Sequence, residues 1–427
     1  MNKFPFKETK LSNGLHVITA EMPYMESVAI GILAGVGGRY ESEKSLGISH
    51  FLEHACFKGT KKRNARQISQ AIEGIGGSIN GFTSEEVTCY YAKVRYPKFE
   101  QAFDVLADMY LNAVFNCKEM DRERGVIKEE IKMYKDMPGQ LVYDDFSSTI
   151  WKNHPLGRSV LGTFDSVDGI SGKDLSNFRK NNYTPKNTVI SVAGNISHDN
   201  VLKCIEKHLS KWNSGGNVPE FIPFKSNQKA PRVFIRNQAT EQAHLVAGFH
   251  SVGRSHPDRF ALRVLSNILG GNMSSRLNHE IREKRGLAYS AHSHLSRFVD
   301  VGSLIIGVDT DVKKLPDALN LVLKICSNIA GKGIKPTELK HAKEYLNGIM
   351  ALAMEHTTEF MIWLGRNALT ENDFLTIEQL IEKTNDVTLD DVQRVAKKIF
   401  KNNRLSVALI ADNIDKKKIT GIAKLKN

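Results

Sequence analysis

The sequence predicts an α+β protein made of two similar domains, each with a mixed or antiparallel sheet and helices packed on one face. Three observations favour this fold class. The chain has 427 residues, which is more than one hydrophobic core usually holds. Segments typical of strands and of helices mix without the strict alternation of a parallel βαβ fold. One order of elements recurs at the end of each half of the chain, which indicates a duplication.

The first half opens with two strand patterns. Residues 15–19 and 28–32 alternate or run apolar, as strands do, and helical stretches follow them. Turn-forming residues between 213 and 231 indicate a linker. We therefore divide the chain into a first domain at 1–214, a linker at 215–230 and a second domain at 231–427.

The recurring order is a helix, a turn and an apolar strand. In the first half these are residues 174–178, Asn187 and 189–196, and in the second half 391–395, Asn403 and 405–414. Only the first half carries a pattern with evident chemistry, so we expect the second domain to bind substrate.

The composition is that of an ordinary globular protein and does not indicate a nucleic-acid-binding protein. Hydrophobic residues make up 41% and charged residues 25% of the chain, as in ordinary soluble proteins. The net charge of +12 comes from basic residues that are spread along the chain and interleaved with acidic ones. No nucleic-acid motif accompanies them, so we expect no nucleic-acid partner.

The chain shows no sign of secretion or of a membrane span. Its first ten residues carry charge but no apolar stretch, and the longest apolar run, residues 28–36, contains two glycines. Five scattered cysteines without a C-x-x-C pair indicate free thiols in a reducing compartment. We therefore expect a cytoplasmic protein with no membrane partner.

The strongest motif is His50-Phe51-Leu52-Glu53-His54. Two histidines four apart on a helix project from one face, so their imidazoles converge on one metal ion. Glu53 lies beside them, close enough to hold a metal-bound water, in an inversion of the commoner H-E-x-x-H helix. Ser49 is the candidate cap of this helix. The alternative is two core histidines with a surface glutamate.

A catalytic zinc ion needs a third protein ligand and an open fourth position. The candidate segment is 121–134, where Glu123, Ile127, Glu130 and Tyr134 share one helical stripe while Glu129 turns away. A carboxylate on this stripe is partly buried and needs a partner, which a metal ion provides. The alternative is an exposed helix with Glu–Lys pairs.

These residues resemble the pitrilysin-type zinc peptidases, which include insulin-degrading enzyme and the mitochondrial processing peptidase. In that family the inverted motif supplies two histidine ligands and a general base, and the third ligand is a distal glutamate that follows another glutamate by seven residues. The resemblance implies His50, His54 and Glu130 as ligands of one zinc ion and Glu53 as the base, with Glu123 as the earlier glutamate of the site. Glu129 is the remaining rival for the ligand.

The resemblance continues through 151–163, 270–277 and 282–289. It implies that Arg282 and Tyr289 reach the zinc site from the second half; without it, they read as a surface arginine and a strand tyrosine. Residues 78–84 resemble the family's edge strand, on which a peptide adds beside the metal, and this implies substrate contacts for Asn80, Gly81 and Phe82. The family often has alanine where Gly81 stands.

The sequence thus predicts a zinc-dependent endopeptidase in which Glu53 activates a zinc-bound water. The resemblance implies that two such chains pair, each a duplicated half of a clam-shell, around a chamber that encloses unfolded peptides or oligopeptides. We expect a homodimer. The alternative is a non-catalytic peptide-binding or partner subunit of a heterodimeric processing peptidase. A His₂Glu site also accepts manganese or cobalt, and His292 with His294 is a weaker second metal pair.

Overall fold

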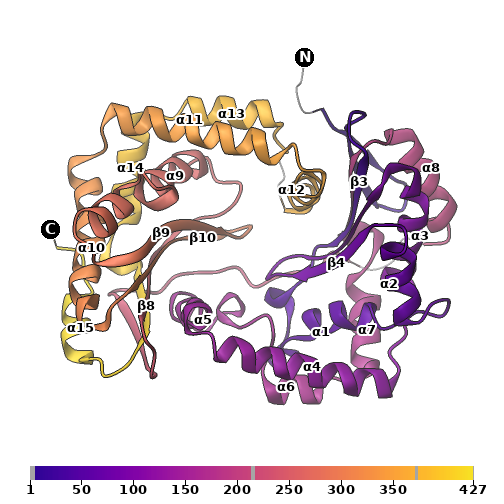
Figure 1. The fold of residues 1–427 in the computed structure, drawn as a ribbon, viewed down its shortest axis with the longest axis horizontal. Coiled ribbons are helices and arrows are strands. Elements are labelled where there is room, and N and C mark those ends of the chain that lie inside the picture. Colours follow the sequence, from indigo (N-terminus) through magenta and orange to yellow (C-terminus); the bar gives the residue numbers. More distant parts are fainter. Residues whose placement is uncertain (1–4, 213–216, 371–373, 427) are drawn as a thin grey trace. The chain divides into compact units, whose positions relative to one another are not determined.

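The computed structural model describes residues 5–212, 217–370 and 374–426, and Figure 1 shows its ribbon. Positions 215 and 216 of the expected linker lie outside the described residues. The chain forms two compact units. The first takes residues up to 132, 158–222 and 351–378, and the second takes 133–157, 223–350 and 379 onward.

The first unit contains a mixed six-stranded sheet. Its strand order is β1-β2-β6-β3-β5-β4, in which β2 and β6 are parallel and the other neighbours are antiparallel. The predicted strands at 15–19 and 28–32 are β2 and β3. The strands are β1 (Lys7–Lys10), β2 (His16–Glu21), β3 (Ser27–Ala34), β4 (Ser78–Thr83), β5 (Thr88–Arg95) and β6 (Thr188–Gly194).

The second unit contains a five-stranded sheet with the order β7-β11-β8-β10-β9. Without β1, the two sheets match position by position, and each holds one parallel pair, here β7 with β11. This match confirms the predicted α+β duplication. The strands are β7 (Arg232–Asn237), β8 (Ala243–Val252), β9 (Ala288–Arg297), β10 (Val301–Thr310) and β11 (Leu405–Ala411).

The repeated helix before each closing strand begins with the same local structure. In α7 (Gly172–Asn182), Ser171 and Asp174 form a capping box, and in α14 (Leu389–Ile399), Thr388 and Asp391 form its counterpart. Each box satisfies two backbone N–H groups that a helix start leaves without partners. The recurring order predicted from the sequence is therefore a recurring local structure.

Helices cover the sheets. Those of the first unit are α1 (Ile48–Cys56), α2 (Ala65–Glu73), α3 (Phe99–Asn112), α4 (Cys117–Lys135), α6 (Phe164–Gly169), α7, α8 (His198–Leu209) and α12 (Thr357–Thr370). Those of the second are α5 (Pro138–Ile150), α9 (Arg259–Ser266), α10 (Leu315–Lys332), α11 (Pro336–Ala353), α13 (Ile377–Asn385), α14 and α15 (Lys416–Ile422).

Two of these helices are exchanged between the halves of the sequence. Helix α5 comes from the first half but packs on β8 and β11, and α12 comes from the second half but packs on β3 and β6 (Figure 1). A Cβ at Gly31 of β3 would collide with Met361 of α12, and a Cβ at Gly248 of β8 would collide with Phe146 of α5. The compact units therefore do not coincide with the linear division at 214 and 231.

The main helical layer and the sheet of the first unit share one apolar core. Val28, Ile30 and Ile32 of β3 are buried in it with Phe51 of α1 and Phe103 of α3. The five cysteines are free thiols. None of the helices in the described ranges combines the length and the apolar character that crossing a membrane requires.

Candidate metal centre

Helix α1 carries the His50–His54 motif and begins after Gly47, whose φ of 84° lies in the left-handed region. Ser49 is not the cap, contrary to the expectation from the sequence, because it lies inside the helix. The carboxylate of Glu41 takes that role by accepting hydrogen bonds from the N–H groups of Gly47 (2.7 Å) and Ser49 (2.8 Å). The first turn of the motif helix is thus capped by a side chain that lies six residues before Gly47.

The two histidines lie one turn apart on α1. Their ring centroids are 4.5 Å apart, and His50 is buried while His54 is half-buried. Burial, together with the nearby His54, lowers the pKa of His50 to about 3. His50 is therefore a neutral imidazole at neutral pH, which is the form that binds metals.

Helix α4 brings a carboxylate to both rings. Glu130 Oε2 lies 3.6 Å from His50 Nε2 and 3.6 Å from His54 Nε2. The stripe predicted from the sequence is the inward one, since Glu123 and Ile127 are buried and Glu130 is half-buried. Glu129 is exposed and pairs with Lys132 at 2.6 Å. The structure therefore brings Glu130, and not Glu129, to the histidines.

The spacing of these ligand atoms fits a single zinc ion. Zn–N and Zn–O bonds of about 2.0–2.2 Å in a tetrahedron place ligand atoms roughly 3.3 Å apart, close to the separations seen here. Ligand atoms of His50, His54 and Glu130 all lie within 4.8 Å of one another. Within the described ranges, no other set of three His, Cys, Asp or Glu side chains converges in this way.

Glu123 lies behind His54. Its Oε1 is 2.8 Å from His54 Nδ1, and its Oε2 is 2.6 Å from Lys58 Nζ. Burial would raise the pKa of Glu123, but the hydrogen bonds from His54 and Lys58 outweigh it and hold that pKa below its usual value. An ionised Glu123 accepts the proton on Nδ1, which leaves the lone pair on Nε2 directed to the side of Glu130.

The same carboxylates act on the charge of His54. Burial opposes the charged form, but the hydrogen bond to Glu123 and the nearby carboxylates of Glu53 and Glu130 together raise the pKa of His54. Burial also raises the pKa of Glu130. Three carboxylates thus surround two imidazoles, an excess of negative charge that suits a divalent cation.

Glu53 points to β4. Its Oε2 accepts a hydrogen bond of 2.7 Å from Thr83 Oγ1. Burial raises the pKa of Glu53 above its usual value, and the Thr83 hydrogen bond opposes this shift. A buried carboxylate with a raised pKa is suited to accept and return a proton near neutral pH.

Within the described residues, strand β4 lies at the edge of its sheet and pairs with β5 alone. A Cβ at Gly81 would lie 2.9 Å from Glu53 Oε1, so the glycine leaves room for that carboxylate. The neighbouring Asn80 turns its Oδ1 back to the N–H of Gly81 (2.8 Å), and Phe82 packs near Tyr91 with ring centroids 6.3 Å apart. Of Asn80, Gly81 and Phe82, the three residues expected to contact substrate, Gly81 is the one that lies against Glu53.

Arg282 and Tyr289 belong to the second unit, where the structure brings them together. The guanidinium carbon of Arg282 lies 5.1 Å from the centre of the Tyr289 ring, and Tyr289 is 78% exposed. Both line an open cavity of about 860 Å³ with His292 and Tyr345. The two side chains thus form a cation–π contact at the surface of this cavity.

Among the described residues, no third His, Cys, Asp or Glu side chain converges with His292 and His294. Their rings are stacked with centroids 5.9 Å apart, and His292 Nε2 lies 3.0 Å from the hydroxyl of Tyr143 on α5. The Tyr143 hydroxyl is therefore the hydrogen-bond partner of His292 Nε2.

The sequence interpretation missed three residues that hold the site. They are Glu41 at the start of α1, Lys58 behind Glu123, and Thr83 on Glu53. Lys58 follows His54 by four residues, a helical spacing that signals a shared face. Nothing local links Glu41 or Thr83 to the motif, because their contacts depend on the fold.

Comparisons with known proteins place this arrangement in a family. Residues 16–164, which hold all the motif residues, match the family model described as Insulinase (Peptidase family M16), and residues 169–346 match the model described as Peptidase M16 inactive domain. The chain is 38% identical over 410 residues to an uncharacterized zinc protease, YmxG, of Bacillus subtilis, covering 95% of this chain and 98% of the relative. This chain belongs to peptidase family M16.

Other relatives cover this M16 chain equally well. An uncharacterized zinc protease of Mycobacterium leprae is 36% identical, with 96% of this chain and 92% of the relative covered. A protease from Helicobacter pylori has the same fold, with a TM-score of 0.89 at 23% identity, and the match covers 95% of this chain and 99% of that one. The resemblance inferred from the motif is thereby confirmed for the family and the fold.

Proposed function

We propose that this M16 chain is a zinc endopeptidase that hydrolyses unfolded peptides or oligopeptides. One observation carries the proposal: His50, His54 and Glu130 converge on one point, and the buried Glu53 stands beside them. Zinc, when bound, supplies a Lewis acid that polarises the scissile carbonyl and acidifies a water molecule. Relatives named zinc proteases support this metal.

The protein's own groups carry the proton and orient the site. Glu53 accepts a proton from the attacking water and returns it to the leaving amine. Thr83 keeps its carboxylate turned to β4 through the hydrogen bond to Oε2. Glu123 and Lys58 keep His54 in the tautomer that offers Nε2 to the metal.

The free edge of β4 supports binding of the substrate as an added strand. Such an edge offers backbone donors and acceptors to a peptide of any sequence, and β5 is the one strand that pairs with β4 in the part of the chain that the structure describes. Because Gly81 lies against Glu53, a peptide on this edge passes next to the base. We propose that Arg282 and Tyr289 orient the same peptide, that two chains form a homodimer, and that the reaction takes place in an enclosed chamber.

The test is the substitution Glu53→Gln. The amide accepts no proton at neutral pH, so hydrolysis of an unstructured reporter peptide should fall at least about 10²-fold. Zinc content, measured by elemental analysis, should stay near one ion per chain. Glu129→Gln, a change of the same kind at an exposed site, is the control and should keep both zinc and activity.

Two results would overturn the proposal. One is a Glu53→Gln variant that retains most of the wild-type kcat. The other is zinc-loaded wild-type protein that binds peptides without cleaving any member of a diverse library, which would favour the non-catalytic subunit.

A further inference from the structure

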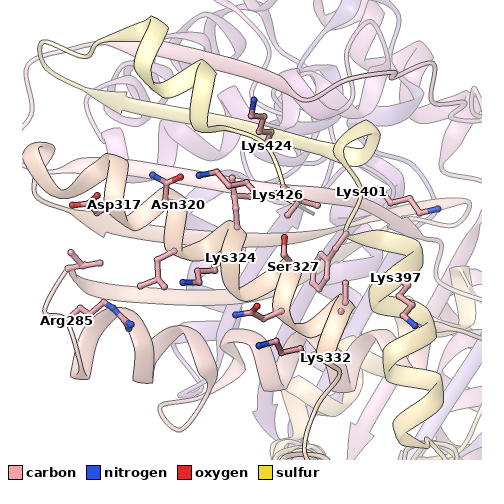
Figure 2. A pocket seen from close by; sticks show the side chains of 18 residues that line it. Arg285, Asp317, Asn320, Lys324, Ser327, Lys332, Lys397, Lys401, Lys424 and Lys426 are labelled. Carbon is pink, nitrogen blue, oxygen red and sulfur yellow. The ribbon is translucent and has the colours of Figure 1, made fainter.

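A second cavity of the second unit carries a different kind of chemistry. It is half-open, has a volume of about 1210 Å³, and shares no lining residue with the cavity around Arg282 and Tyr289. Figure 2 shows that side chains from α10, from the end of α14 and from the segment after α15 face it. Nothing in the proposed hydrolysis uses these residues.

The lining is strongly basic. Seven of the 18 lining residues are Lys or Arg, against 59 of 427 in the whole chain, and Asp317 is the one carboxylate among the 18. The cations are Arg285, Lys324, Lys332, Lys397, Lys401, Lys424 and Lys426. Like charges that line one concave surface repel each other and attract anions.

Most of these cations have no acidic partner. Arg285 pairs with Glu280 at 2.5 Å. The six lysines make no ion pair with any residue in the described ranges, although many other lysines of the chain do, such as Lys58 and Lys398. Their charge is therefore available to a ligand.

The floor between the lysines is apolar. Leu321 and Leu323 of α10, Phe400 and Leu425 line it, and the last two are only 6% and 9% exposed. Phe400 packs edge-on against Phe249 with ring centroids 5.0 Å apart, so its position is fixed from behind. A ligand that fills this cavity gains from apolar groups as well as from negative charge.

This combination favours one class of anion. Single-stranded nucleic acid is usually held by aromatic faces on which bases stack, and the one aromatic ring of the lining, Phe400, is buried. A fatty acid offers a single carboxylate to seven cations. An extended peptide with alternating acidic and apolar residues presents carboxylates about 6.6 Å apart along one side, from the strand rise, and apolar groups along the other.

We propose that this cavity binds acidic peptide segments with interspersed apolar residues and acts as a recruitment site for them. That the bound peptide is a substrate rests on the proposed peptidase function; the binding itself does not. The lysines select for negative charge, and Leu321, Phe400 and Leu425 select against fully polar acidic chains.

The experiment measures binding without cleavage. Full-length protein carrying Glu53→Gln is titrated into a fluorescein-labelled peptide of about ten residues in which Glu and Leu alternate, a length of roughly 33 Å if extended. Peptides with Glu–Ser and Lys–Leu alternation, and a single-stranded oligo-dT, serve as competitors. We expect the Glu–Leu peptide to bind tightest and the Lys–Leu peptide not to compete.

Charge reversal locates the site. Lys324→Glu, Lys397→Glu and Lys424→Glu together change three exposed lining positions on three segments, and should weaken binding by at least about tenfold at moderate salt. The matched control reverses Lys229, Lys313 and Lys383, which are exposed in the same unit but do not line the cavity. The control should change binding less than about threefold, because distant exposed charges are screened. The thermal midpoints of both variants verify that they fold.

Each other outcome decides against the proposal. Equal weakening in the control would show a general charge effect, and tighter binding of oligo-dT would identify a nucleic-acid site. An unchanged affinity in the lining variant would place the peptide elsewhere. Cleavage of a neutral reporter by the wild type is assayed separately, so failure of this site and failure of the peptidase function give different results.

Discussion

Replacing Glu123 by glutamine tests the contact that lies behind the metal centre. Glu123 is 4% exposed and joins His54 Nδ1 (2.8 Å) to Lys58 Nζ (2.6 Å). Glutamine keeps the size of the side chain and one acceptor oxygen but removes the negative charge. Its amide group must then face either Lys58 or the ring N–H of His54, both of which are donors.

The magnitude follows from the two contacts. Carboxylates behind metal-binding histidines are worth about ten- to hundredfold in metal affinity, which is about 1.4–2.8 kcal/mol. The broken pair with Lys58 adds less, because the Lys58 side chain is 31% exposed and reaches water. We therefore expect the zinc Kd of Glu123→Gln to rise ten- to hundredfold. The metal-free protein should lose about 1–3 kcal/mol of stability, because one buried donor loses its acceptor.

The assay is competition for zinc with a chromophoric chelator, in parallel with two matched variants. Glu129→Gln should bind zinc as the wild type does, since Glu129 is exposed and pairs with Lys132. Glu130→Gln should bind most weakly, because a ligand is lost. If Glu123→Gln retains wild-type affinity, the contact does not tune the metal; if it binds more weakly than Glu130→Gln, Glu123 is itself the ligand.

Three further predictions concern the surroundings of the site. Thr83→Val removes the hydrogen bond to Glu53, so the pKa of Glu53 should rise and the acidic limb of the pH profile of kcat/KM should move to higher pH, with zinc content unchanged. Arg282→Ala and Tyr289→Phe should each lower kcat/KM by about tenfold or more while leaving zinc content and Tm near wild type. Burial raises the pKa of Glu41 from 4.5 to about 7, so ionising this carboxyl group destabilises the folded protein. The free energy of unfolding should therefore fall as pH rises from about 4.5 to about 7. Denaturant unfolding at several pH values should show a smaller fall for Glu41→Gln.

The parts that the sequence predicted are those encoded locally. His50 and His54 converge because a four-residue spacing fixes one helix face. Glu130 was separated from Glu129 because Glu130 lies on the inward stripe of α4 and Glu129, one residue earlier, lies off it. The duplication was visible because a helix, a turn and an apolar strand recur at the end of each half, and the structure shows that each of these helices begins with a capping box. Each of these signals spans a few residues.

The parts that it did not predict depend on contacts between distant residues. Thr83 lies 30 positions from Glu53, and they meet only because β4 packs against α1. Ser49 seemed the natural cap, but Gly47 turns the chain so that Glu41 accepts the N–H groups instead. In both regions the local pattern predicted the helix or strand correctly. It predicted the wrong cap for α1, and it predicted no hydrogen-bond partner for Glu53.

The exchange of α5 and α12 is a further feature that no local pattern predicts. Helix α5 buries Val142, Phe146 and Ile150 on the second sheet, and Arg236 of β7 holds Asp145 with two hydrogen bonds. Fully burying three such apolar side chains stabilises by roughly 5–9 kcal/mol, which is comparable to the whole stability of a domain.

Helix α12 makes the reciprocal contribution. It buries Phe360, Met361 and Leu364 in the first unit, and the carbonyl of Met361 accepts a hydrogen bond of 2.7 Å from the buried Ser191 of β6. A cut at residue 214 would leave the first sheet without α12 and would leave α5 without its sheet. The apolar burial lost in either case is comparable to the free energy of unfolding of a whole domain. The chain is therefore a duplication in sequence whose two units each take a helix from the other half, and the unit that holds the metal centre includes α12 of the second half.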